Sequence, residues 1–162
     1  MKGIRIGGRG LAALAAAAAL LVFAAVALAV APAPGTYNGK TRKQHRHVQV
    51  KVDDTGRVSF FEIRWKAKCK KKGRTWGPDG TQDVDGTSDP IKQDGTGNFH
   101  DSGSYDRTDT GGYHGHFKVS FKGKFTTPTK ASGKFNVKVR VSRNGKYVDT
   151  CRKRKLKWRV HS

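Results

Sequence analysis

The chain has 162 residues and a formal net charge of +21, from 33 Lys and Arg against 12 Asp and Glu. This length excludes a multi-domain body once an N-terminal targeting segment is set aside. The basic excess favours association with anions and carries no information about fold. The net charge is +10 over residues 32–75, −6 over 76–112 and +14 over 113–162.

The first 31 residues have the composition of a secretory signal peptide. Lys2, Arg5 and Arg9 precede an uncharged, Ala-rich run, and the Ala-Leu-Ala at 27–29 is the best cleavage sequence. An uncleaved anchor is the alternative, because the 21 apolar residues at 11–31 are enough to span a bilayer. Both predict a body that is secreted or extracellular and associated with the cell envelope, joined to the leader by a linker at 32–35.

Alternating residues predict three strands in the first basic block. The first covers 36–42, and in the second, over 45–53, Val48, Val50 and Val52 alternate with polar residues. The Asp-Asp-Thr-Gly at 53–56 predicts a hairpin turn. The third strand, over 57–69, changes phase at Phe60 and Phe61, which predicts a β-bulge; a strand apolar on both faces is the alternative.

The acidic block at 76–112 is rich in Gly, Asp, Ser and Thr and poor in apolar residues. It is predicted as a long loop with one short strand near 98–101, a feature that marks functional or mobile segments. Asp83, Asp85 and Asp89 offer oxygen ligands for calcium, without the closing Glu of an EF-hand. The alternative is electrostatic: the loop folds over the basic surface and lowers its self-repulsion.

Residues 113–142 alternate twice and predict the central hairpin of the domain, with an apolar and a basic side on each arm. Asn144-Gly145 predicts a second hairpin, leading to a strand at 146–151, a turn at 152–155 and a last strand at 156–160. Seven or eight strands without an amphipathic helix predict an all-β fold. We expect an antiparallel sandwich or closed barrel, in a single domain at 36–162.

Cys69 and Cys151 are the two cysteines of the chain. An even count outside the cytoplasm predicts a disulfide. A metal site or a catalytic thiol is the alternative, although neither Cys has a partner at ligand spacing.

Several residues carry a resemblance to a known family. The pattern is Gly35-x-Tyr37-x-Gly39-x-Thr41, Cys69, Gly123-x-Phe125, Ala131-Ser132-Gly133-x-Phe135 and Cys151 followed by Trp158. It resembles a family of small secreted bacterial β-domains of unknown function. The resemblance implies paired cysteines and a core built from the Gly-x-Phe and Ala-x-Gly strands. It implies no activity, and this chain departs from the pattern in its many basic residues and its acidic block.

Basic residues recur on the polar sides of the predicted strands in a number that solubility alone does not explain. Without the leader, 30 basic and 12 acidic residues leave a net charge of +18. This excess predicts binding to anionic cell-envelope or extracellular polymers, or to an acidic membrane surface. Nucleic acid would bind only non-specifically, since the sequence has no reading helix and no RNP-type aromatic pattern. The predicted polyanion-binding residues are Lys118, Lys122, Lys124, Lys138, Arg140, Arg152, Lys153, Arg154, Lys155 and Lys157, and the same polar sides carry Lys66, Lys68, Lys134 and Arg159.

Two His-x-His pairs, His45 with His47 and His114 with His116, each lie on one face of a predicted strand. Two such pairs on neighbouring strands would make a site for Zn²⁺ or Cu²⁺. Solvated histidines on a polar face are the alternative, and the neighbouring cations would repel a divalent ion.

The sequence gives little support for a catalytic or a ligand-carrying function. His100-Asp101-Ser102 contains triad residues, but neighbours in sequence seldom converge in space. A pocket inside a barrel would make a small-ligand carrier, with plain core as the other interpretation of its aromatic residues; they are Trp65, Phe117, Phe121 and Trp158. The sequence therefore predicts a non-enzymatic binding module with no cofactor.

Overall fold

The computed structural model describes residues 30–71, 79–87 and 89–162. Within them the chain is all-β and has ten strands: β1 (Gly35–Thr41), β2 (His47–Val52), β3 (Val58–Lys66), β4 (Lys68–Cys69), β5 (Asp79–Asp85), β6 (Lys92–Gln93), β7 (Asn98–Thr108), β8 (Tyr113–Thr127), β9 (Lys130–Arg143) and β10 (Lys146–His161). All pairings are antiparallel. The expected fold class is confirmed, with more strands than the seven or eight predicted.

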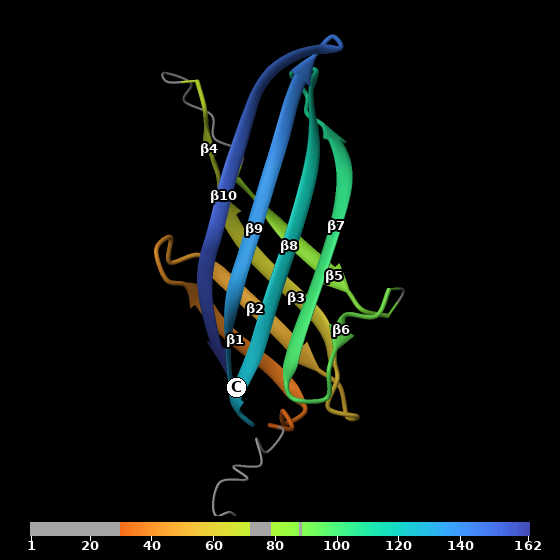
Figure 1. Cartoon of the computed structure of the whole chain (residues 1–162), viewed down its shortest axis with the longest axis vertical. Helices are drawn as coiled ribbons and strands as arrows, with labels where there is room; N and C mark the ends of the chain where they lie inside the picture. The colour runs from red at the N-terminus through yellow and green to blue at the C-terminus, as the bar shows by residue number, and fades with distance from the viewer. Residues whose placement is uncertain (1–29, 72–78, 88) are drawn as a thin grey trace, which may run out of the picture.

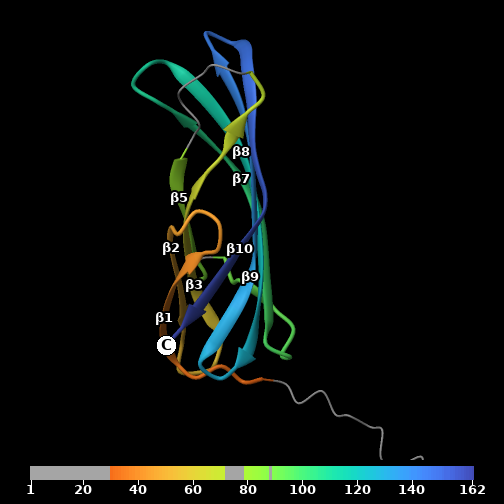
Figure 2. The ribbon, with the colours of Figure 1, turned by 90° about the vertical axis from the view of Figure 1, so that its left-hand side faces the viewer.

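The strands form one curled sheet in the order β5-β3-β2-β1-β10-β9-β8-β7-β6, and β4 pairs with β10. In Figure 1, β7 to β10 lie in front of β1, β2, β3 and β5, and Figure 2 shows these two halves as facing layers. β5 and β6 are the two edge strands of this order. The sheet is therefore an open half-barrel, and the closed barrel is wrong.

The core fills the space between the two halves, as strand alternation requires. Val48 and Val50 of β2 are fully buried, as is Phe135 of β9. Phe61 of β3 stacks on Phe121 of β8, with ring centroids 4.0 Å apart. Contact between rings from opposite halves shows that the concave side of the sheet is the interior.

The predicted hairpins and bulge are confirmed. β8 and β9 pair from Tyr113↔Arg143 to Thr127↔Lys130. The β9–β10 turn has Asn144 at φ 49° and Gly145 at φ 72°, the left-handed pair of a two-residue hairpin. In β3 the register with β2 shifts between Phe60 and Val58, so the bulge lies beside the predicted position.

The turn predicted at 152–155 is wrong, because β10 runs through it. The register with β9 shifts between Lys153 and Leu156, and Lys155 has a φ of 51°. Cys151 and Leu156 are both buried although they are five residues apart, a spacing that a regular strand places on opposite faces. A bulge inserts the residues that bring both inward.

The acidic segment is not a long loop in the part that the structure describes. β5 pairs with β3, and β7 pairs with β8 along its whole length, from Asn98↔Lys124 to Thr108↔His114. These strands have few apolar residues because β5 is an edge strand and β7 leaves much of its surface exposed. The acidic residues therefore belong to the sheet and its turns.

The predicted disulfide is confirmed between Cys69 of β4 and Cys151 of β10. The two cysteines lie directly opposite each other in this pair of strands. A disulfide indicates a non-cytoplasmic compartment. The predicted leader at 1–31 lies almost wholly outside the described residues, and among those described no helix is long and apolar enough to span a membrane.

Candidate anion-binding surface

The ten predicted polyanion-binding residues lie on three adjacent strands. β8 carries Lys118, Lys122 and Lys124, and β9 carries Lys138 and Arg140. The other five belong to the middle of β10, over 152–157. The sequence placed them on separate hairpins, and the sheet order β10-β9-β8 brings them side by side.

Three lysines form a row across these strands, here called the lysine row. Lys122 of β8 lies directly opposite Lys134 of β9, and Lys134 lies directly opposite Lys157 of β10. All three are exposed. Opposite residues of antiparallel strands have Cα atoms about 5 Å apart and side chains on one face. His100 of β7 continues the row beyond Lys122.

A second row of basic residues runs parallel to the lysine row and is offset from it by four residues on β8 and on β9. Lys118 is opposite Lys138, Lys138 is opposite Arg152, and Arg152 is opposite Lys68 of β4. At about 3.4 Å per residue the two rows lie about 14 Å apart. Ser120 and Asn136 occupy the space between them and are joined by a 3.2 Å hydrogen bond from the Asn136 amide.

These two rows have no carboxylate partner among the described residues. The ion pairs found there join Arg46 to Asp79, His47 to Glu62, and His114 and His116 to Asp106. Like charges directly opposite each other destabilise a sheet. The fold therefore keeps an uncompensated basic face, and the expected acidic cover over it is wrong for the described part of the acidic segment.

Three aspartates instead hold hairpin turns by one repeated pattern. The carboxylate of Asp53 accepts backbone N–H bonds from the second and fourth residues after it, and so do those of Asp94 and Asp109. A glycine with positive φ stands third in each turn, at 56, 97 and 112. The side-chain hydroxyl of Thr96 and the amide of Asn98 hold the pKa of Asp94 far below its ordinary value. The spacing Asp-x-x-Gly was the sequence signal for these turns.

Next to the rows, the bulge of β10 forms one wall of a hollow of about 480 Å³, here called the bulge hollow. Lys153, Arg154, Lys155, Leu156 and Lys157 line it from β10, and Arg42 and Lys43 line it from the turn between β1 and β2. Six of its seven lining residues are cations. Arg42 and Lys43 were absent from the predicted site, because only the long-range pairing of β1 with β10 brings them there.

Both walls of the bulge hollow are fixed by hydrogen bonds. The Lys155 backbone N–H donates to the side-chain oxygen of Asn136 at 2.9 Å, and the Arg42 N–H donates to the carbonyl of Lys157 at 2.8 Å. The buried hydroxyl of Thr41 accepts the N–H of Arg46 at 3.0 Å and closes the turn. The positions of the lining backbone are therefore set before any anion arrives.

A second hollow of about 380 Å³ lies over the lysine row, where Gly123 of β8 faces Gly133 of β9. Lys122, Lys124 and Lys134 surround it together with His100. A Cβ at Gly133 would meet the Lys122 carbonyl oxygen and the ring of Trp158, which explains the glycine of the Ala-Ser-Gly motif as a packing requirement. The basic face is thus hollowed at two places.

The histidine pairs do not meet. His47 is on β2 and His114 and His116 are on β8, and among the described residues no group of three potential ligands contains a histidine. His45 lies in the turn before β2 at φ 54°. His116 Nδ1 lies 2.9 Å from a carboxylate oxygen of Asp106, so this pair has a local partner instead.

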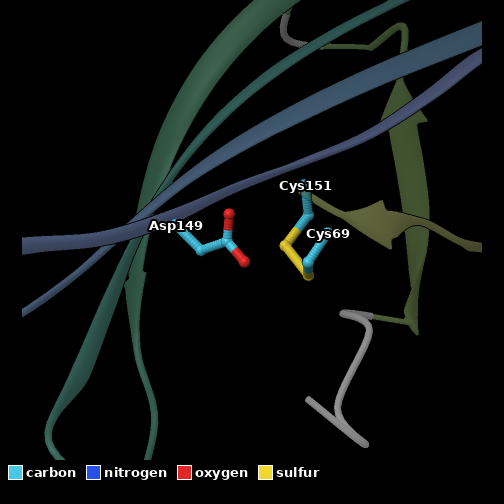
Figure 3. A group of neighbouring side chains, drawn as sticks. All are labelled: Cys69, Asp149 and Cys151. Atoms are coloured by element: carbon cyan, nitrogen blue, oxygen red, sulfur yellow. A yellow bond between two sulfur atoms is a disulfide. The ribbon is translucent and has the colours of Figure 1, made fainter. Parts of the chain in front are cut away.

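Among the described residues, one group of three potential metal ligands has its ligand atoms within 4.8 Å of one another: Cys69, Asp149 and Cys151. Figure 3 shows the Asp149 carboxylate beside the disulfide. Bonded sulfurs are not thiolates, so this group is not a metal site in the oxidised protein. The calcium candidates Asp83, Asp85 and Asp89 form no such group.

The aromatic residues of the alternative carrier pocket are mostly core. Trp65 and Trp158 are each 1% exposed and Phe121 is 5% exposed. Phe117 is less buried and lines a hollow of about 420 Å³ with Val139 and Val141. The four aromatics therefore do not line one common pocket.

Of the triad-like residues, Asp101 is separated from His100 and Ser102. His100, Asp101 and Ser102 follow one another in β7, and a strand sends successive side chains to opposite faces. Asp101 is opposite Phe121, on the core side, whereas His100 is opposite Lys122, on the basic face.

No protein-family model, no curated protein and no solved structure matches the chain. The resemblance to small secreted β-domains therefore stays a prediction.

Proposed function

We propose that this protein is a secreted, non-enzymatic β-domain that binds an anionic polymer of the cell envelope or extracellular space through the face carried by β8, β9 and β10. The observation that carries the proposal is the lysine row, in which Lys122, Lys134 and Lys157 stand directly opposite one another without a carboxylate partner among the described residues.

The spacing of the cations supports a polymer as the ligand. Neighbouring cations within one row are about 5 Å apart, measured across the strands. The two rows are about 14 Å apart, measured along the strands. A chain with a negative charge every few ångströms can contact several of these cations at once and release its counterions. A single small anion can neutralise only part of such a face.

The stability cost of the row supports a functional role. Two unit charges 5 Å apart repel by about 1 kcal/mol in water, and the chain contains twelve acidic residues that were available to neutralise them. Nine of the twelve hold turns, pair elsewhere or bind backbone N–H groups. A bound polyanion would remove the repulsion.

The test compares retention of the full chain on dextran sulfate and on neutral dextran. The row variant Lys122→Gln, Lys134→Gln, Lys157→Gln should be retained more weakly on dextran sulfate than the wild type. The matched variant Lys66→Gln, Lys130→Gln, Lys146→Gln removes the same charge at exposed positions outside the rows and should be retained almost as well as the wild type. Equal weakening in both variants would refute the proposed face. Stronger retention on phosphatidylglycerol vesicles than on dextran sulfate would replace the polymer with a membrane.

A further inference from the structure

We propose that the bulge hollow is a discrete binding site for phosphoryl groups that carry several charges in a small volume, distinct from the diffuse attraction of the rows. The site deepens the proposed function, since it would give a polymer with phosphoryl groups one fixed point of attachment on the surface. It is formed by Arg42, Lys43, Lys153, Arg154, Lys155 and Lys157.

The charge of the hollow determines the class of ligand. Six cations surround about 480 Å³, so a ligand must bring several negative charges into a compact space to balance them. A lone carboxylate brings one charge. Arg42 and Arg154 add planar guanidinium groups, which match the oxygens of phosphate in two-point hydrogen bonds.

The backbone of the hollow points to the same conclusion. Lys155 has a φ of 51°, a left-handed conformation that is unfavourable for a residue with a Cβ. The Asn136 side chain holds it there through the Lys155 N–H. The bulge also interrupts the pairing of β10 with β9 between Lys153 and Leu156, and four consecutive basic residues, at 152–155, lead into it. Strained backbone held by its surroundings is typical of binding sites.

The hollow is open to ligands at a gap in the sheet. On the side of β10 away from β9, β4 pairs at Cys151 and Arg152, and β1 pairs from Trp158 to His161. The residues between these two pairings therefore have no strand on that side within the described chain. The β1–β2 turn approaches the same gap through its bond from Arg42 to Lys157.

The experiment is calorimetric titration of the full chain with pyrophosphate in 150 mM salt, and with citrate as a carboxylate of similar charge. We expect one saturable site for pyrophosphate and weaker binding of citrate. Arg42→Gln with Arg154→Gln should weaken pyrophosphate binding by about tenfold or more. Lys118→Gln with Lys138→Gln, equal in charge and outside the hollow, should change it less than about threefold.

Several outcomes would overturn the site: no saturable binding, equal losses in the two double variants, or citrate binding as tightly as pyrophosphate. Competition identifies the source of the phosphoryl group. If pyrophosphate displaces bound long-chain polyphosphate, the hollow accepts a polymer. If pyrophosphate binds and the polyphosphate stays bound, the hollow serves a free small phosphate. Retention on dextran sulfate is judged separately with Lys122→Gln, Lys134→Gln, the two residues of the lysine row that do not line the hollow, so failure of the hollow and failure of the basic face are distinguishable.

Discussion

Asp149 is the one buried carboxylate among the described residues, with 1% of its surface exposed. It accepts backbone N–H bonds from Thr150 at 2.6 Å, from Lys71 at 3.2 Å and from Lys70 at 3.3 Å. Burial raises the pKa of this carboxyl, but the three N–H groups and the charge of Lys71 together outweigh burial and leave the pKa below its ordinary value. Asp149 thereby fastens the chain that follows Cys69.

Asp149→Asn should lower the free energy of unfolding by about 1–3 kcal/mol, because an amide offers one acceptor oxygen where the carboxylate offers two. Because the folded pKa is lowered, the carboxylate stabilises the protein above its unfolded pKa of about 4, and this contribution is lost as pH falls through the folded pKa. Denaturation by urea between pH 7 and pH 2 measures the difference. Asp54→Asn, at an exposed turn position, is the control. A wild-type advantage that persists undiminished to pH 2 would contradict this role.

At the scale of single elements, the bulge of β10 rests on one left-handed lysine. Lys155→Gly should be more stable than Lys155→Ala by about 1 kcal/mol, since both remove the charge and only Gly removes the Cβ from a positive φ. Urea denaturation of the two variants measures this difference. At Lys157, in regular strand, the order should reverse, with Ala more stable than Gly. Finding Ala equal to Gly at 155 would mean that the chain is not left-handed there.

The repulsion within the lysine row predicts that a substitution there can raise stability at the expense of polyanion binding. Lys134 stands between Lys122 and Lys157, so Lys134→Glu turns two repulsive pairs into attractive ones. Its free energy of unfolding should rise by about 0.5–1 kcal/mol at low salt, with a smaller rise for Lys134→Gln. In 1 M salt the gain should largely vanish, because the screening length falls to about 3 Å. A loss of stability, or a gain that ignores salt, would show that the row is not under repulsion.

The sequence predicted the elements whose two faces differ most. β2, β8 and β9 alternate between core and solvent, so their period of two is visible along the chain. β5 was missed and β7 was predicted only near 98–101, because an edge strand and a largely exposed strand need few apolar residues. The bulge of β10 looked like a turn, since a lysine at positive φ gives no Gly or Asn signal.

The candidate site was predictable only in part for a related reason. Which basic residues of β8 and β9 share a polar face follows from alternation, and on this basis Lys118, Lys122, Lys124, Lys138 and Arg140 were predicted. Which strands are neighbours follows from long-range pairing, so the direct opposition of Lys134 and Lys157 and the approach of Arg42 to the bulge could not be read from local sequence.

At the scale of the whole molecule, charge is divided by role. Acidic residues hold hairpin turns and one buried anchor, while basic residues gather on β8, β9 and β10. The curled sheet gives its concave side to the core and its convex side to solvent, and the disulfide joins β4 to the strand that links both halves. A strong basic field on one face follows from this division.

The most direct test of the basic face is the salt dependence of dextran sulfate binding. The logarithm of the binding constant should fall linearly with the logarithm of salt concentration, with a slope set by the number of cations engaged. The row variant Lys122→Gln, Lys134→Gln, Lys157→Gln should reduce the slope by about 2, at roughly 0.7 for each lysine that no longer neutralises a sulfate group. The matched variant at Lys66, Lys130 and Lys146 should change it by less than about 1. Equal changes in both variants would mean that net charge alone attracts the polymer, and that the rows have no special part in binding.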